Sequence, residues 1–105
     1  MENNQISAED IWQLKGAFMI EFGAGWCGFC QSAQPMIAQA LVQYPNVSHI
    51  KIEDGKGQRL GRIYAVKLWP TLVFLKDGVE VSRLVRPSDI TILTKALSEI
   101  NFSKA

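Results

Sequence analysis

The two cysteines of this 105-residue chain, Cys27 and Cys30, are separated only by Gly28 and Phe29. The apolar run over residues 17–22, just before them, predicts a strand that is buried on both faces. The residues after them carry apolar side chains at three- and four-residue spacing, which predicts an amphipathic helix. The cysteines therefore stand at a junction where a buried strand must turn into a helix.

This junction has a chemical consequence for the first thiol. If Cys27 opens the helix, its sulfur lies against unsatisfied backbone N–H groups at the positive end of the helix dipole. Such a setting lowers the pKa of a thiol, and the thiolate is the species that attacks a disulfide. The order strand, C-x-x-C, helix therefore favours thiol–disulfide exchange.

A structural, metal-binding or inert role for the cysteine pair has less support. A purely structural disulfide is disfavoured because so small a ring constrains little of the unfolded chain. A zinc or iron–sulfur site needs about four ligands in most structural cases, and besides the two cysteines the chain has a single histidine, His49. Inert buried cysteines are disfavoured because Gly28, Phe29 and the adjacent Trp26 suit a turn at the surface. We therefore expect no metal.

Composition narrows the class of protein. The length, with 48% hydrophobic and 20% charged residues, is typical of one globular domain over residues 1–105. A net charge of +1 and the absence of basic clusters interleaved with aromatic residues predict no nucleic-acid or membrane partner. No apolar run approaches the ~20 residues of a transmembrane helix. Residues 1–5 are polar and do not resemble a secretory signal, so we expect a cytoplasmic location, where reactive dithiols are usually catalytic or redox-sensing.

The remaining pattern predicts an α/β fold with a central mixed sheet and helices on both faces. A short helix capped by Ser7 comes first, and Trp12 is expected to fill the core. A second strand over 47–53, a short helix over 58–64 and a hairpin of strands 71–75 and 79–85 follow. The last helix, capped by Ser88 or Asp89, is expected to turn five apolar residues inward: Ile92, Leu93, Ala96, Leu97 and Ile100.

Four segments together resemble the thioredoxin family, in its order and at its spacing, over nearly all of the chain after about Ile6. They are Trp26-Cys27-Gly28-Phe29-Cys30, Pro35 five residues on, Trp69-Pro70-Thr71 and the Lys76-Asp77-Gly78 turn. The resemblance implies a thioredoxin-like fold and protein disulfide oxidoreduction without a bound cofactor. It further implies disulfide-bearing substrate proteins as partners and electrons from a flavin- and NADPH-dependent partner reductase, and we expect a monomer.

The same resemblance implies roles for individual residues. Cys27 would form the mixed disulfide with a substrate protein, and the more buried Cys30 would resolve it. The Trp69–Pro70 bond would be cis and lie against the cysteines, with its backbone available to a substrate strand.

Glu21 matches a buried acidic position of the family. Desolvation in an apolar strand should raise the pKa of its carboxyl and fit it for proton transfer. It would act, through water, as the base that deprotonates Cys30 during resolution, and Lys51 is placed to pair with it. His49 is expected to have a structural role.

Departures from the family pattern indicate a divergent member. Phe29 stands where the family commonly has proline, which should alter the helix start and the redox poise. Arg86 occupies a loop where a small Gly-Ala pair is frequent, and its charge would stabilise the Cys27 thiolate and select acidic substrates. We expect a substrate-binding surface of six residues: Trp26, Gly28, Phe29, Trp69, Pro70 and Arg86.

The sequence leaves two further functions open. The domain could be an oxidant or isomerase, because the direction of exchange depends on the reduction potential rather than on the motif. It could also be a protein-binding module that docks through Trp26, Phe29 and Trp69, with the dithiol incidental.

Overall fold

The computed structural model describes residues 6–56 and 58–101, so residues 1–5, for which the sequence predicts no secretory signal, lie outside it. Strand β1 (Ala17–Gly23) lies inside a four-stranded sheet of order β2-β1-β3-β4. Strand β2 (Ser48–Glu53) runs parallel to β1 and forms one edge. Strand β3 (Thr71–Lys76) is antiparallel to β1, and β4 (Val79–Val85) returns antiparallel to β3 as the other edge. The predicted mixed sheet is confirmed.

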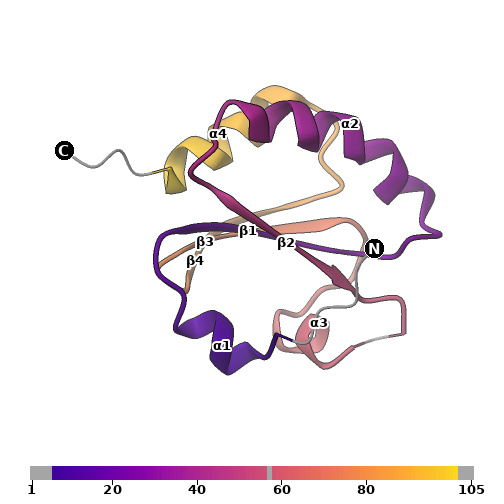
Figure 1. The fold of residues 1–105 in the computed structure, drawn as a ribbon. Coiled ribbons are helices and arrows are strands. Elements are labelled where there is room, and N and C mark those ends of the chain that lie inside the picture. The colour runs from indigo at the N-terminus through magenta and orange to yellow at the C-terminus, as the bar shows by residue number, and fades with distance from the viewer. Residues whose placement is uncertain (1–5, 57, 102–105) are drawn as a thin grey trace.

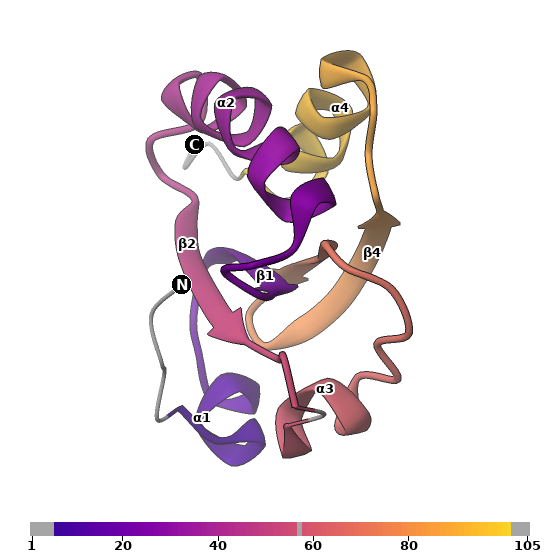
Figure 2. The same cartoon turned by 90° about the vertical axis from the view of Figure 1, so that its right-hand side faces the viewer.

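Helices cover both faces of this sheet (Figures 1 and 2). Helices α2 (Gly28–Val42) and α4 (Ile90–Ile100) lie on one face. Helices α1 (Ala8–Trp12) and α3 (Arg59–Ile63) lie on the other. No helix within residues 6–56 and 58–101 is long and apolar enough to cross a membrane.

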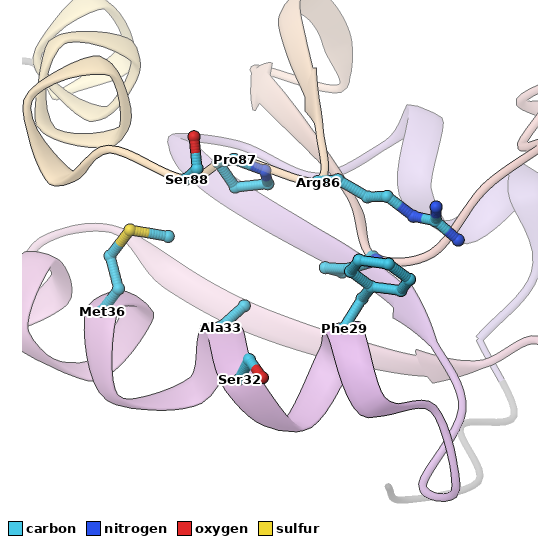
Figure 3. A pocket seen from close by; sticks show the side chains of 8 residues that line it. Phe29, Ser32, Ala33, Met36, Arg86, Pro87 and Ser88 are labelled. Atoms are coloured by element: carbon cyan, nitrogen blue, oxygen red, sulfur yellow. The ribbon is translucent and has the colours of Figure 1, made fainter.

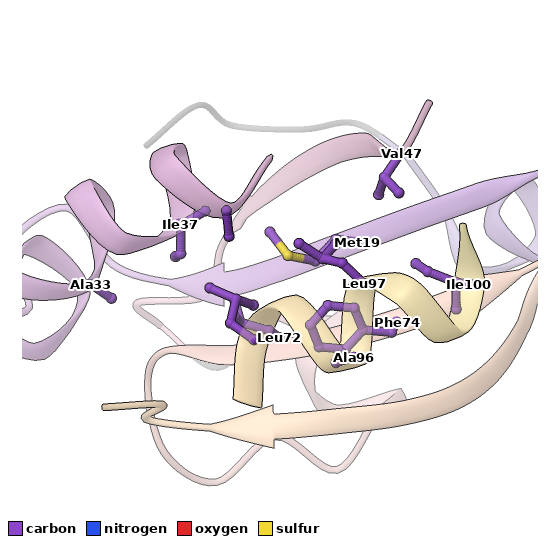
Figure 4. Packing of buried hydrophobic residues seen from close by; sticks show 11 residues of the cluster. Met19, Ala33, Ile37, Val47, Leu72, Phe74, Ala96, Leu97 and Ile100 are labelled. Atoms are coloured by element: carbon purple, nitrogen blue, oxygen red, sulfur yellow. The ribbon is translucent and has the colours of Figure 1, made fainter. Parts of the chain in front are cut away.

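Alternation along β1 divides the core between the two faces, since successive strand side chains point in opposite directions. Met19 packs with residues of α2, α4 and β3 in one cluster (Figure 4). Ile20 and Phe22 pack with α1, α3 and the other face of β3 in a second cluster. Glu21 follows the alternation of Met19 and so points toward the α2 side, where it is fully buried.

Two core predictions are wrong. Trp12 is 54% exposed, because Ile11 takes the inward position at the end of the short helix α1. Ile92 is 48% exposed, while its four companions on α4 are buried. Leu93, Ala96, Leu97 and Ile100 already form one stripe at three- and four-residue spacing, and Ile92 lies about 100° away from Leu93 around the helix.

The β3–β4 hairpin is joined by Asp77 and Gly78, both with positive φ (50° and 81°), as the sequence predicts for an Asp-Gly turn. A Cβ atom at Gly78 would overlap the backbone carbonyl of Trp12. The turn therefore packs against the end of α1, and glycine is required there by conformation and by space.

Gly16 provides a matched control, because it also has positive φ (95°) but a Cβ there would meet nothing within 4 Å. We expect Gly16→Ala to destabilise the protein by about 1–2 kcal/mol, the cost of a left-handed alanine. Gly78→Ala should cost at least about 1 kcal/mol more, because the Trp12 carbonyl must also move. Urea denaturation of both variants measures the difference, and equal losses would contradict this packing.

Candidate functional site

Cys27 is the N-cap of α2, with extended backbone angles (φ −81°, ψ 120°). A turn closed by the bond from Cys27 N–H to Ala24 O (3.1 Å) brings the chain from the end of β1 to this position. Cys27 Sγ accepts a hydrogen bond from Cys30 N–H at 3.3 Å, so the sulfur does what a serine or aspartate oxygen does at other helix starts. The prediction that Cys27 opens the helix is confirmed.

The two thiols, both free, differ in exposure and acidity. Cys27 keeps 7% of its surface exposed and Cys30 only 2%. Burial raises the pKa of the Cys27 thiol, but hydrogen bonds from Cys30 and Phe29 and the charge of Arg86 outweigh it, so the pKa lies below its usual value. For Cys30, burial and the hydrogen bond with Cys27 raise the pKa to about 12. The pair therefore consists of one acidic thiol near the surface and one thiol that holds its proton.

The loop before β3 also packs against the cysteines. Its Trp69–Pro70 peptide bond is cis, as the resemblance implies. Trp69 packs on a small buried cluster of Ala24, Cys27 and Cys30. The Trp69 indole N–H donates to Asp54 Oδ2 at 3.0 Å, which holds the ring in place. Asp54 is a buried neighbour of the site that the sequence did not single out.

Two aromatic side chains beside the cysteines are open to solvent: Trp26 is 70% exposed and Phe29 is 59% exposed. Trp26 meets Trp69 edge to face, with ring centroids 5.4 Å apart. Gly28 adds no side chain between them, and a Cβ there would enter open space. The residues predicted to form the substrate surface thus surround Cys27, although their binding role stays a prediction.

Arg86 occupies the loop after β4 with a left-handed backbone (φ 50°), which is costly for a residue with a side chain. Two hydrogen bonds hold it there: its N–H donates to Pro70 O at 2.9 Å, and its Nε donates to Trp69 O at 2.8 Å. The guanidinium carbon lies 3.9 Å from the centroid of the Phe29 ring, a cation–π contact. Arg86 and Phe29, which the resemblance marks as departures from the family pattern, contact each other here.

Beside this contact lies a groove of about 450 Å³, shown in Figure 3. It runs between α2 and the loop that leads into α4, with Arg86 and Phe29 at one end. Its walls are Phe29, Ser32, Ala33, Met36, Pro70, Arg86, Pro87 and Ser88. The groove thus has the Arg86 cation at its rim.

Glu21 lies behind the cysteines with none of its surface exposed. Its Oε1 is 2.7 Å from His49 Nε2, and its Oε2 accepts from Gln34 Nε2 at 2.7 Å. The same Gln34 amide donates to Cys30 O at 2.9 Å. The carboxyl is thus tied to α2 and to β2 at once.

The predicted burial of Glu21 is confirmed, but the predicted direction of its pKa is wrong. Burial raises the pKa, yet the hydrogen bonds of His49 and Gln34 and the charges of His49 and Lys51 together hold it below the usual value. Lys51 lies opposite Glu21 in the β1–β2 register and acts on it through its charge.

The sequence did not single out His49 and Gln34 as neighbours of Glu21. Their spacing from Lys51 and from Cys30 nevertheless offers a signal. His49 is two residues before Lys51 on the same strand, hence on the same face. Gln34 is four residues after Cys30, one helical turn along α2.

As for metals, the described part of the chain holds no group of three or more His, Cys, Asp or Glu side chains arranged to bind an ion.

Comparison with known proteins agrees with this geometry. A family model described as Thioredoxin matches residues 2–99. The thioredoxin of Chlamydia pneumoniae is 32% identical over 96 residues, which cover 90% of this chain and 94% of that protein. The thioredoxin of Chlamydia trachomatis is 34% identical over 84 residues, 80% of this chain and 82% of that one. The structure of thioredoxin 2 from Pseudomonas aeruginosa, in its reduced form, superposes with a TM-score of 0.85 at 46% identity, covering 94% of this chain and 92% of that one.

The charge of Arg86 gives a test of the site's electrostatics. Because that charge lowers the pKa of Cys27, Arg86→Gln should raise this pKa and leave less thiolate at a given pH. The midpoint of the pH dependence of Cys27 alkylation by iodoacetamide should move to higher pH. Lys95→Gln, which removes a cation paired with Glu99 on α4, should leave the midpoint in place. An unchanged midpoint in Arg86→Gln would contradict the assigned role of its charge.

Proposed function

Because this chain belongs to the thioredoxin family, we propose that it is a protein disulfide reductase that works through Cys27 and Cys30. Family membership and the C-x-x-C pair support thiol–disulfide oxidoreductase chemistry in general. The observation that carries the role of Cys27 as the attacking thiol is the hydrogen bond from Cys30 N–H to Cys27 Sγ at the start of α2, which favours a thiolate on Cys27 whatever the direction of exchange.

Two exchange steps transfer the electrons. The Cys27 thiolate attacks one sulfur of the substrate disulfide, forms a mixed disulfide and releases the other substrate sulfur as a thiolate. Cys30 then loses its proton and attacks Cys27 Sγ, which closes the Cys27–Cys30 disulfide and releases the second substrate thiolate. The substrate gains two electrons and the protein loses two. The pKa of about 12 for Cys30 supports this order, because that thiol stays protonated until the mixed disulfide exists.

The oxidised protein must be reduced again for turnover. We assign this to a partner reductase that uses a flavin and NADPH, so that the domain itself needs no cofactor. The proposal includes a monomeric, cytoplasmic protein without a nucleic-acid or membrane partner, and the net charge of +1 supports the last of these points.

Arg86 and the groove support a preference among substrates. The guanidinium uses Nε to hold Trp69 O, and it stacks on Phe29 at the edge of the groove. Its position favours a substrate segment with a carboxylate close to the disulfide, since guanidinium and carboxylate form strong paired hydrogen bonds. Apolar neighbours of that carboxylate would contact Phe29 and Met36 in the groove.

One observation favours a second candidate, an oxidant or isomerase. Hydrogen bonds and the Arg86 charge stabilise the Cys27 thiolate, which stabilises the reduced form and makes the couple more oxidising. Titration of the Cys27–Cys30 couple against glutathione separates the two candidates. A potential more negative than that of the glutathione couple supports the reductase, and one near or above it supports the oxidant or isomerase.

Single serine substitutions test the order of the two steps. With dithiothreitol as electron source, the wild-type protein should reduce a disulfide-bonded protein, and Cys27→Ser should lose this activity completely. Mixed with the substrate in the absence of dithiothreitol, which would cleave the product, reduced Cys30→Ser should stop at a mixed disulfide between Cys27 and the substrate, visible by mass spectrometry, because the second step is blocked. A mixed disulfide on Cys30 in Cys27→Ser, with none on Cys27 in Cys30→Ser, would contradict the assignment. Retained biological activity in the double serine variant would show that the domain is a binding module.

A further inference from the structure

Asp54 is a buried acidic residue that neither exchange step uses. It follows the last residue of β2, and only 4% of its surface is exposed. Its backbone N–H donates to Gly23 O at 2.7 Å, which fixes it beside the end of β1. A Cβ atom at Gly61 would overlap the Asp54 carboxyl, so glycine at that position of α3 makes room for it. The carboxyl is therefore enclosed against α3, close to the turn that leads to Cys27.

From this position the Asp54 carboxyl holds the side chain of Trp69. Asp54 Oδ2 accepts the indole N–H at 3.0 Å, while Oδ1 accepts no hydrogen bond from the described residues. The bond to Trp69 is thus the contact through which the carboxyl reaches the site. At the other end of the same residue, Trp69 O accepts from Arg86 Nε at 2.8 Å. Trp69 is therefore held at its ring by Asp54 and at its main chain by Arg86.

The preceding residue, Glu53, holds the turn that carries Trp26. Glu53 Oε1 accepts from Gly25 N–H at 3.3 Å, and Oε2 accepts from Gly55 N–H at 3.0 Å. A Cβ atom at Gly55 would overlap Glu53 Oε2 and lie 3.4 Å from Trp26 Nε1, so the loop passes close to both side chains. Two consecutive acidic residues thus fix the surroundings of two tryptophans.

The two tryptophans form one aromatic surface beside Cys27. Trp69 is partly buried and packs on the cluster of Ala24 and both cysteines. Trp26, which is largely exposed, meets Trp69 edge to face, with ring centroids 5.4 Å apart. Indole rings offer a large apolar contact area to a partner at low conformational cost. A side chain next to a substrate cysteine that approaches Cys27 would therefore contact this aromatic surface.

We propose that Asp54 is a positioning residue for substrate binding: it holds the Trp69 indole against Trp26, and the aromatic surface so formed binds an apolar side chain next to the substrate cysteine. This role rests on the proposed function and adds a substrate preference to it. Without the bond to Asp54, the Trp69 ring is free to turn away from Trp26, and the aromatic surface loses its shape. Cys27 keeps its own hydrogen bond from Cys30 N–H. The loss therefore falls on substrates with apolar residues beside the disulfide.

Two symmetrical peptide disulfides test this preference. One peptide has leucine on each side of its cysteine, and the other has serine at both positions. The reduced protein is mixed with each peptide disulfide, and the peptide thiol released is measured by chromatography after acid quenching, which gives two second-order rate constants. Their ratio measures the preference for leucine. Because both peptides react with the same thiolate, a change in the pKa of Cys27 cancels from this ratio.

We expect the wild-type protein to prefer the leucine peptide by about fivefold or more, the effect of partly burying one apolar side chain. Asp54→Leu should lower this preference to less than about twofold, because leucine cannot accept the indole N–H. Asp54→Asn should keep most of the preference, since its amide oxygen can accept the same bond. Glu99→Gln, which removes an acid paired with Lys95 on α4, is the matched control and should change nothing. In a Trp69→Phe background, Asp54→Leu should change the ratio by less than about twofold, because the bond is already absent.

A full leucine preference in Asp54→Leu would overturn the role of Asp54, and so would equal rates of the wild-type protein with both peptides. Hydrogen exchange in the wild-type protein gives a second test that needs no folded Asp54→Leu. The indole N–H of Trp69 should exchange at least about tenfold more slowly than that of Trp26 by NMR, and equal rates would contradict the proposal.

Hydroxyethyl disulfide, which carries no side chains, distinguishes a failure of the proposed function. If the wild-type protein reduces this reagent but shows no preference between the peptides, only the role of Asp54 is wrong. If it reduces neither the reagent nor the peptides, Cys27 is not an exchange nucleophile, and the role of Asp54 fails with the proposed function.

Discussion

Cys27 has a structural task and a chemical one, and both depend on its place as the N-cap of α2. The thiol accepts the hydrogen bond of Cys30 N–H and so begins the helix. The same bond favours the thiolate on Cys27, while burial and then the hydrogen bond between the two thiols raise the pKa of Cys30. The difference in acidity between two identical side chains, three positions apart, thus follows from the burial of Cys30 together with the place where the helix starts.

The sheet determines what surrounds this helix start. Strand β1 leads directly into the Cys27 turn, and its alternation sends Glu21 toward α2 while its neighbours Ile20 and Phe22 face the opposite cluster. Parallel pairing of β2 with β1 then places His49 and Lys51 on the side of Glu21. A buried acid is costly unless it is hydrogen-bonded, and here two side chains from different elements meet that need. The surface side of the site depends likewise on contacts between loops, above all the one between Arg86 and Phe29.

Much of the fold could be predicted because its signals are local. The Asp77-Gly78 turn, the Ser7 cap and the apolar run of β1 each specify their own element. The pKa of Glu21 could not be predicted in direction, because it depends on His49 and Gln34, which reach it only after β2 and α2 have packed. The exposure of Trp12 could not be predicted for a related reason: a five-residue helix has too few turns for spacing alone to identify its buried side. The contact of Arg86 with Phe29 joins residues 57 positions apart, so no local sequence pattern predicts it.

The most direct test of the account is the site-specific titration of the two thiols in the reduced protein, followed through the Cβ chemical shifts of Cys27 and Cys30 by NMR. The account predicts that Cys27 loses its proton first, at a pH below that of an ordinary thiol, and that Cys30 stays protonated until about pH 12. Because the two thiols interact, the titration gives two steps of the pair, and the shifts tell which sulfur changes in each. Both thiols titrating together near the ordinary value, or Cys30 titrating first, would contradict the claim that the start of α2 sets the chemistry.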